Sequence, residues 1–145
     1  ALRGRLYVCG GSIGLDALSS AERFIPEAGR WEALPEMAQG RVGAAGAALA
    51  GSVCICGGGQ VEEALRSVER FRPERGLWEP GPGLPWAFRF AASAAVAGRL
   101  LLFGEQLGRG RGLRTARCLQ PEAGAWEELP PMLAARAWAA AVRVL

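Results

Sequence analysis

The hydrophobic positions of this chain fall in short runs that are separated by glycine, proline and polar turn residues. In the clearest stretch, apolar runs at 42–49 and 53–56 are joined by a tight Ala-Gly-Ser turn, and further runs follow at 67–72 and around Trp78. Four short apolar segments with turn residues between them are typical of a four-stranded antiparallel sheet. Gly or Pro interrupts most windows of a dozen residues in which a helix could form. The pattern therefore predicts an all-β chain.

The same succession of segments returns at a nearly fixed spacing. The string YVCGG at 7–11 is followed 47 residues later by CICGG at 54–58 and then, more faintly, by LLFGE at 101–105. Self-similarity with a period of about 20 to 50 residues is the signature of repeat architectures. We therefore divide the chain into repeats at roughly 1–41, 42–88 and 89–136, followed by a final strand at 137–145.

Each repeat also carries features that can be given a physical role. Glycine doublets close one strand in the first two copies, at Gly10-Gly11 and Gly57-Gly58, and tryptophans follow downstream at Trp31, Trp78 and Trp126. Glycines permit backbone conformations that other residues avoid and let a neighbouring chain approach closely. Each indole supplies a large apolar plate that we expect to lie between sheets, so that Trp31→Ala should cost roughly 3 to 5 kcal/mol.

In these features the chain resembles the kelch repeat family, and its "ERF-x-P" and "W-x-x-L-P-x-M" strings resemble the BTB-kelch branch most closely. The third copy departs from the pattern, because Gly104-Glu105 replaces the doublet, Cys118 the basic residue and Leu119 the aromatic. The resemblance implies a partial kelch β-propeller of about three four-stranded antiparallel blades.

Propellers close with about four to eight blades, and three blades leave exposed sheet edges. We therefore expect the segment to be part of a larger propeller. The alternative is a dimer that completes a six-bladed ring.

The amino-acid composition argues against several classes of function. All 17 basic residues are Arg, the chain has no His, and the formal net charge is +3. Without His the chain lacks the usual general base and the commonest metal ligand, so we expect no enzyme, no metal site and no cofactor. The four cysteines have no CxxC spacing and lie mostly in apolar runs, which favours buried free thiols, a reducing compartment and a cytoplasmic location. The uncharged run at 42–59 contains six glycines and is better explained by two strands than by a membrane span.

The loops are the candidate binding region. In blades of alternating strand direction, the loops between strands two and three emerge on the same face as the connections from strand four to the next blade. In the kelch family this face binds peptides, and the position ten residues after the tryptophan often supplies an arginine. The resemblance therefore selects Arg41 and Arg136, with Arg89 one step beyond Phe88. An ion pair at a blade junction is the alternative role for Arg41 and Arg136.

A Gly/Arg-rich loop adds the densest positive charge of the chain, at Arg109, Arg111 and Arg114. Guanidinium groups can fork onto carboxylates or phosphates, whereas the alternative is a solvated loop tip. We expect a protein or peptide ligand, with an acidic ligand as one option. Nucleic acid is not expected, because the aromatic residues that would stack on bases are needed in the core.

The leading hypothesis is the substrate-recognition propeller of a BTB-kelch adaptor for a cullin-RING ubiquitin ligase. The alternative is an actin-binding or scaffolding kelch protein without a ligase role. A copper enzyme of the galactose-oxidase kind would need His and several Tyr, and the chain has no His and one Tyr.

Overall fold

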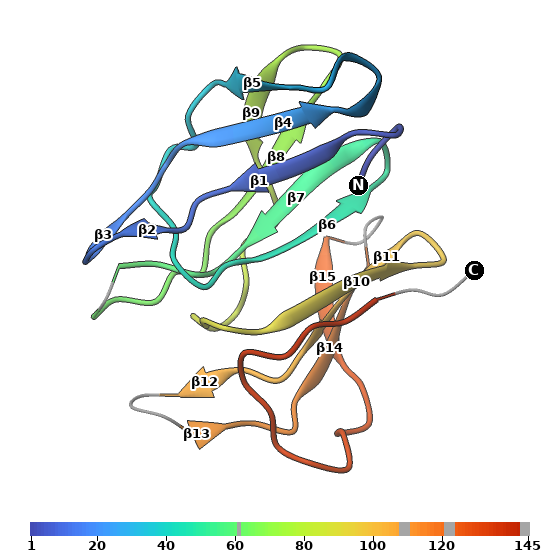
Figure 1. Cartoon of the computed structure of the whole chain (residues 1–145). Coiled ribbons are helices and arrows are strands. Elements are labelled where there is room, and N and C mark those ends of the chain that lie inside the picture. The colour runs from blue at the N-terminus through green and yellow to red at the C-terminus, as the bar shows by residue number, and fades with distance from the viewer. Residues whose placement is uncertain (61, 108–110, 121–123, 143–145) are drawn as a thin grey trace.

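Three antiparallel sheets stacked side by side make up the computed structural model, which describes residues 1–60, 62–107, 111–120 and 124–142 (Figure 1). The first sheet contains β1 (Leu6–Cys9), β4 (Ala21–Ile25) and β5 (Arg30–Leu34). The second contains β6 (Ala45–Leu49), β7 (Ser52–Cys56), β8 (Val68–Arg72) and β9 (Leu77–Pro80). The third contains β10 (Ala92–Val96), β11 (Arg99–Phe103), β14 (Ala116–Gln120) and β15 (Ala125–Glu128).

Two short hairpins extend from the first and third sheets. One pairs β2 (Ser12–Ile13) with β3 (Asp16–Ala17), and the other pairs β12 (Gln106–Leu107) with β13 (Arg111–Gly112). In the described residues the single helical element is the 3-10 turn η1 (Pro26–Ala28). The all-β prediction and the blade architecture are thereby confirmed, with the second repeat forming one complete blade of four strands.

Alternation along the strands builds a core between each pair of sheets. Val53, Ile55 and Phe71 of the second sheet are buried against the first sheet, where Tyr7 and Cys9 pack on them. The next interface repeats this arrangement. Leu100, Leu102 and Leu119 of the third sheet are buried against the second sheet. The second and third blades therefore each present one apolar face to the blade before them.

The tryptophans follow the same rule. Trp78 packs into the core between the first two sheets, and Trp126 packs into the core between the second and third. Trp31 differs from the prediction, because its side chain is 51% exposed. The face of the first sheet that carries Trp31 has no neighbouring sheet among the described residues. The predicted loss of 3 to 5 kcal/mol for Trp31→Ala therefore does not apply to the chain as it stands here.

The glycine doublets adopt the conformations that the sequence suggested. Gly57 and Gly58 have φ values of 60° and 74°. A Cβ atom added at Gly58 would lie 2.8 Å from the backbone nitrogen of Ala44. Both a left-handed conformation and a close backbone approach thus require glycine at this strand end.

The predicted final strand is not formed in the part of it that the structure describes. Residues 137–142 follow the third blade without strand pairing. A first blade strand takes its hydrogen bonds from the second strand of the same blade, as β6 does from β7. No second strand of a further blade is present in the described residues, so 137–142 has nothing to pair with.

Candidate binding surface

One rim of the sheet stack gathers the two kinds of loop that the sequence analysis grouped together. The β2–β3 and β12–β13 hairpins project from the same side of the molecule (Figure 1). Isolated bridges tie the loops to the connections between blades, pairing Leu65 with Phe88 and Leu113 with Arg136. The predicted rim therefore exists as a continuous, hydrogen-bonded strip of backbone.

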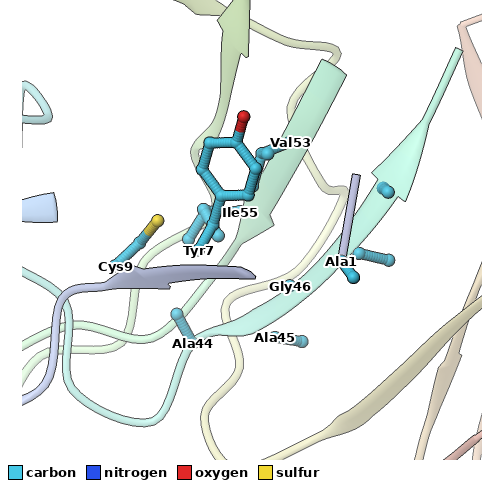
Figure 2. Close-up of a pocket in the computed structure, with 10 residues that line it drawn as sticks. Ala1, Tyr7, Cys9, Ala44, Ala45, Gly46, Val53 and Ile55 are labelled. Carbon is cyan, nitrogen blue, oxygen red and sulfur yellow. The ribbon is translucent and has the colours of Figure 1, made fainter. Parts of the chain in front are cut away.

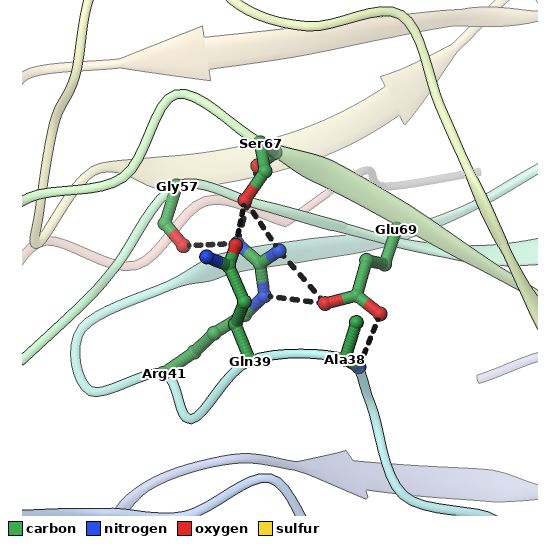
Figure 3. A network of polar contacts seen from close by, with 6 residues as sticks. All are labelled: Ala38, Gln39, Arg41, Gly57, Ser67 and Glu69. Atoms are coloured by element: carbon green, nitrogen blue, oxygen red, sulfur yellow. Dashed lines mark hydrogen bonds and ion pairs between the residues drawn. The ribbon is translucent and has the colours of Figure 1, made fainter.

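Arg41 does not lie on the surface of this rim. Its side chain is completely buried, and its guanidinium donates to Glu69 Oε1 at 2.8 and 3.2 Å and to the carbonyl oxygen of Gly57 at 2.7 Å (Figure 3). Ser67 accepts two more hydrogen bonds, and the second oxygen of Glu69 accepts the backbone N–H of Ala38 at 2.7 Å. The placement of Arg41 as a partner-contacting residue is therefore corrected to the alternative role, an ion pair at a blade junction, because every guanidinium nitrogen is already bonded inside the protein.

The equivalent junction before the third blade has a different composition. Phe88 stands in the place of Arg41 and is 1% exposed. Glu105, which replaces the second glycine of the doublet, is buried and forms an ion pair with Arg117. Arg117 occupies the position of Glu69, and its guanidinium lies 3.8 Å from the centre of the Trp86 ring. Burial lowers the pKa of Arg117. Three positions have thus changed together, and an internal salt bridge is kept with its charges exchanged.

The remaining predicted arginines differ in how accessible they are. Arg136 is exposed, and its backbone N–H donates to the carbonyl oxygen of Leu113 at 2.8 Å. Arg111 and Arg114 are also exposed, and Arg114 Nε donates to the carbonyl oxygen of Met132 at 2.6 Å. Arg89 is half-buried, with one nitrogen donating to the carbonyl oxygen of Gln60 at 2.7 Å. Arg109 lies outside the described residues.

Apolar side chains on the rim were missed by the sequence analysis. Ile13 and Leu15, at the tip of the β2–β3 hairpin, are 72% and 79% exposed, and Leu133 is exposed on the connection that leads to Arg136. The available signal was their position, since both Ile13 and Leu15 flank Gly14 in a turn, where an apolar side chain has no core to enter. The rim therefore combines guanidinium groups with isolated aliphatic contacts.

The cysteines and acidic groups of the described residues form no cluster of three that could hold a metal ion. All four cysteines are free thiols. Burial raises the pKa of Cys9 to about 11 and raises the pKa of Cys56 further. High thiol pKa values suit packing rather than nucleophilic chemistry. Within the described ranges no helix is both long enough and apolar enough to cross a bilayer.

Comparison with known proteins agrees with the geometry. The model of the Kelch motif matches residues 1–38 and 40–85, so the chain belongs to the kelch family. A solved propeller titled "Structure of YjhT" superimposes with a TM-score of 0.80 at 17% sequence identity, covering 94% of this chain and 52% of that one. The chain thus spans about half the length of that structure, which shares its fold. No curated protein matches the sequence. Kelch repeats generally form protein-interaction modules.

Proposed function

We propose that this chain is part of the substrate-recognition propeller of a BTB-kelch adaptor for a cullin-RING ubiquitin ligase, and that its loop rim binds an acidic peptide segment of the substrate. The observation that carries the proposal is the convergence of Arg111, Arg114 and Arg136 from two different loops. The Leu113–Arg136 bridge holds these two loops together. As part of the same proposal the protein works in the cytoplasm, where its free thiols stay reduced.

The chemistry of the rim favours a carboxylate-bearing ligand with some apolar character. Neither Arg111 nor Arg136 forms an ion pair with any acidic residue that the structure describes. The guanidinium groups of both can therefore donate hydrogen bonds to the carboxylate of a ligand. A hydrogen bond to a charged group contributes about 1.5 to 3 kcal/mol. Ile13, Leu15 and Leu133 offer aliphatic contacts beside these charges. Glu62 and Glu63 are exposed on the neighbouring loop and would repel a ligand that is acidic along its whole length.

Binding of a fluorescent acidic peptide with one or two aliphatic residues tests the rim. We expect Arg136→Ala and Arg111→Ala each to weaken binding about tenfold or more, which corresponds to the loss of one charge-assisted hydrogen bond. Arg75→Ala is the matched control, because Arg75 is 69% exposed on a turn between strands three and four, at the opposite end of its blade. Equal losses in all three variants would indicate unspecific attraction and would remove the rim from the proposal.

The ligase assignment needs a separate experiment on the full-length protein. Affinity capture should recover a cullin together with the protein, and this recovery should not depend on Arg136. Cosedimentation with actin filaments without cullin recovery would instead support the scaffolding alternative. The two experiments are independent, so the rim can bind peptides even where the adaptor role is rejected.

A further inference from the structure

A cavity of about 240 Å³ lies between the second and third blades. Leu49, Val68 and Leu119 give it an apolar wall, and Arg70 and Arg72 line it from β8. It also borders the turn between β6 and β7, which is at the opposite end of the blade from the loop rim. The cavity is therefore separate from the rim, and both blades that form it belong to this chain.

The cavity exists because two side chains are smaller here than at the first junction. Between the first and second blades the rings of Tyr7 and Phe71 lie with their centres 6.2 Å apart, and Tyr7 packs on the second sheet (Figure 2). The strand registers put Cys54 and Leu119 at the same two positions one repeat later. Small side chains in the place of large ones leave a cavity where the surroundings do not close in.

One arginine of the cavity lacks the carboxylate partner that its equivalent has. In the first blade Arg23 donates from Nε and Nη2 to Glu32 on the neighbouring strand, at 2.9 and 2.7 Å. In the second blade Arg70 lies opposite Glu79 in the same register, but Glu79 accepts instead from two other arginines, each at 2.9 Å. Nε of Arg70 is buried and has no hydrogen-bond partner among the described residues. A buried donor without a partner costs free energy, which an acceptor on a ligand would recover.

Size and polarity together define the ligand. An apolar cavity of about 150 Å³ is large enough to hold benzene, so this larger one accommodates an aromatic ring or a short branched chain together with one carboxylate. A guanidinium group binds a carboxylate through two parallel hydrogen bonds, and Ser52 adds a hydroxyl group to the wall. A strongly hydrated inorganic anion fits poorly, because the apolar wall offers nothing in exchange for its lost water.

The equivalent region of the first junction does not offer the same combination. The space that remains there, about 210 Å³, is lined by Arg3, Arg5, Tyr7, Pro73 and Glu74. Arg3 already forms an ion pair with Glu74. No leucine, valine or isoleucine is among these described lining residues, so an apolar group would find little to pack on.

We propose that the cavity between the second and third blades is a binding site for a small organic monocarboxylate. The carboxylate accepts hydrogen bonds from Arg70, and the apolar part, about the size of a benzene ring, packs on Leu49, Val68 and Leu119. This inference goes beyond the proposed function and does not rest on it, because the cavity and the loop rim share no residue. Since the ligand contacts two blades of the folded chain, its binding should raise the melting temperature.

Benzoate is the probe that tests the site. Isothermal titration calorimetry on the unmodified chain should show saturable binding of one benzoate, and benzamide, which has the same shape without the charge, should bind at least about tenfold more weakly. Benzoate should also slow the alkylation of Cys54, which lines the cavity, and leave that of Cys118, on the other face of its strand, unchanged. Burial raises the pKa of the Cys54 thiol, so the reaction is run at alkaline pH and read by mass spectrometry.

Three variants locate the ligand within the cavity. Arg70→Gln should weaken benzoate binding about tenfold or more. It should not lower the melting temperature of the free chain, because Arg70 Nε makes no hydrogen bond to the described residues. Arg23→Gln is the matched control at the equivalent position of the first blade, and it should keep benzoate binding although it breaks an ion pair. Cys54→Tyr restores the larger side chain of the first junction and should abolish binding by filling the space.

Several results would overturn the proposal. Benzoate binding that is absent, equal to that of benzamide, or unchanged in Arg70→Gln would each do so. Binding without protection of Cys54, or binding that is lost in Arg136→Ala, would place benzoate elsewhere on the molecule, with the same consequence. Loss of acidic-peptide binding at the loop rim while benzoate still binds would contradict the proposed function alone.

Discussion

Arg41 has a different role from the one that the family resemblance implied, because it bonds inside the protein instead of contacting a partner. The sequence pattern that selects it is a surface pattern, yet the arginine points inward and ties the connection between the first two blades to β8. Its bonds to Glu69, Ser67 and the carbonyl oxygen of Gly57 join three separate segments of the chain. A buried ion pair adds little net stability, but breaking it is costly because one charge is left uncompensated.

We therefore expect Arg41→Met to lower the free energy of unfolding by about 3 to 5 kcal/mol, because the carboxyl group of Glu69 is only 8% exposed and would be left buried without its partner. Urea denaturation measures the loss. Adding Glu69→Leu should restore much of it, since an apolar pair of similar volume replaces the ion pair. The control is Arg75→Met, which removes a surface ion pair and should cost at most about 1 kcal/mol. A comparable loss of unfolding free energy in Arg41→Met and Arg75→Met would show that the buried ion pair contributes no more to stability than a surface ion pair.

Where two blades meet, three positions depend on one another, so that no single side chain can be changed alone. The first junction combines Arg41, Gly58 and Glu69, and the second combines Phe88, Glu105 and Arg117 at the equivalent positions. Changing one member alone leaves a buried charge without its partner. This explains why Phe88, Glu105 and Arg117 differ together from their equivalents at the first junction, while the third blade still contains four paired strands.

Exchanging the second set for the first tests this coupling. Arg117→Glu alone should lower the free energy of unfolding by about 3 to 5 kcal/mol, because it places a second carboxylate beside buried Glu105 and removes the cation from the Trp86 ring. The triple variant Phe88→Arg, Glu105→Gly and Arg117→Glu should be more stable than the single one in the same urea titration. Arg111→Glu, at an exposed position, serves as the control. If the triple variant is less stable than Arg117→Glu, the two junctions are not interchangeable sets.

Strand positions were predictable from the sequence because each strand has its own apolar alternation and its own turn residues. For this reason β6 and β8 lie within the predicted ranges, and β7 begins one residue earlier than predicted, at Ser52. The positions of Trp31 and of residues 137–142 were not predictable, since burial and pairing depend on neighbouring sheets that a strand's own sequence does not specify. Arg41 was misplaced for a related reason. The spacing from Trp31 places Arg41 on the connection between two blades. The direction of its side chain depends on the buried carboxylate of Glu69, which the spacing does not reveal.

The exposed apolar face of the first sheet, which carries Leu6, Val8 and Trp31, bears on how stability should depend on protein concentration. If the exposed face of β1 is covered by a second copy, folding and association are coupled, and the melting temperature should rise by roughly 2 to 4 °C for each tenfold increase in concentration. Val8→Glu should abolish this dependence, because it puts a carboxylate on the face that the second copy covers, while the side chain it replaces is 54% exposed in the single chain. Ile13→Glu changes an aliphatic residue of the rim that is 72% exposed, and it should keep the dependence. Calorimetry over a hundredfold range of concentration distinguishes these cases, and a melting temperature that is independent of concentration in the unmodified chain would mean that its apolar face is not covered by association.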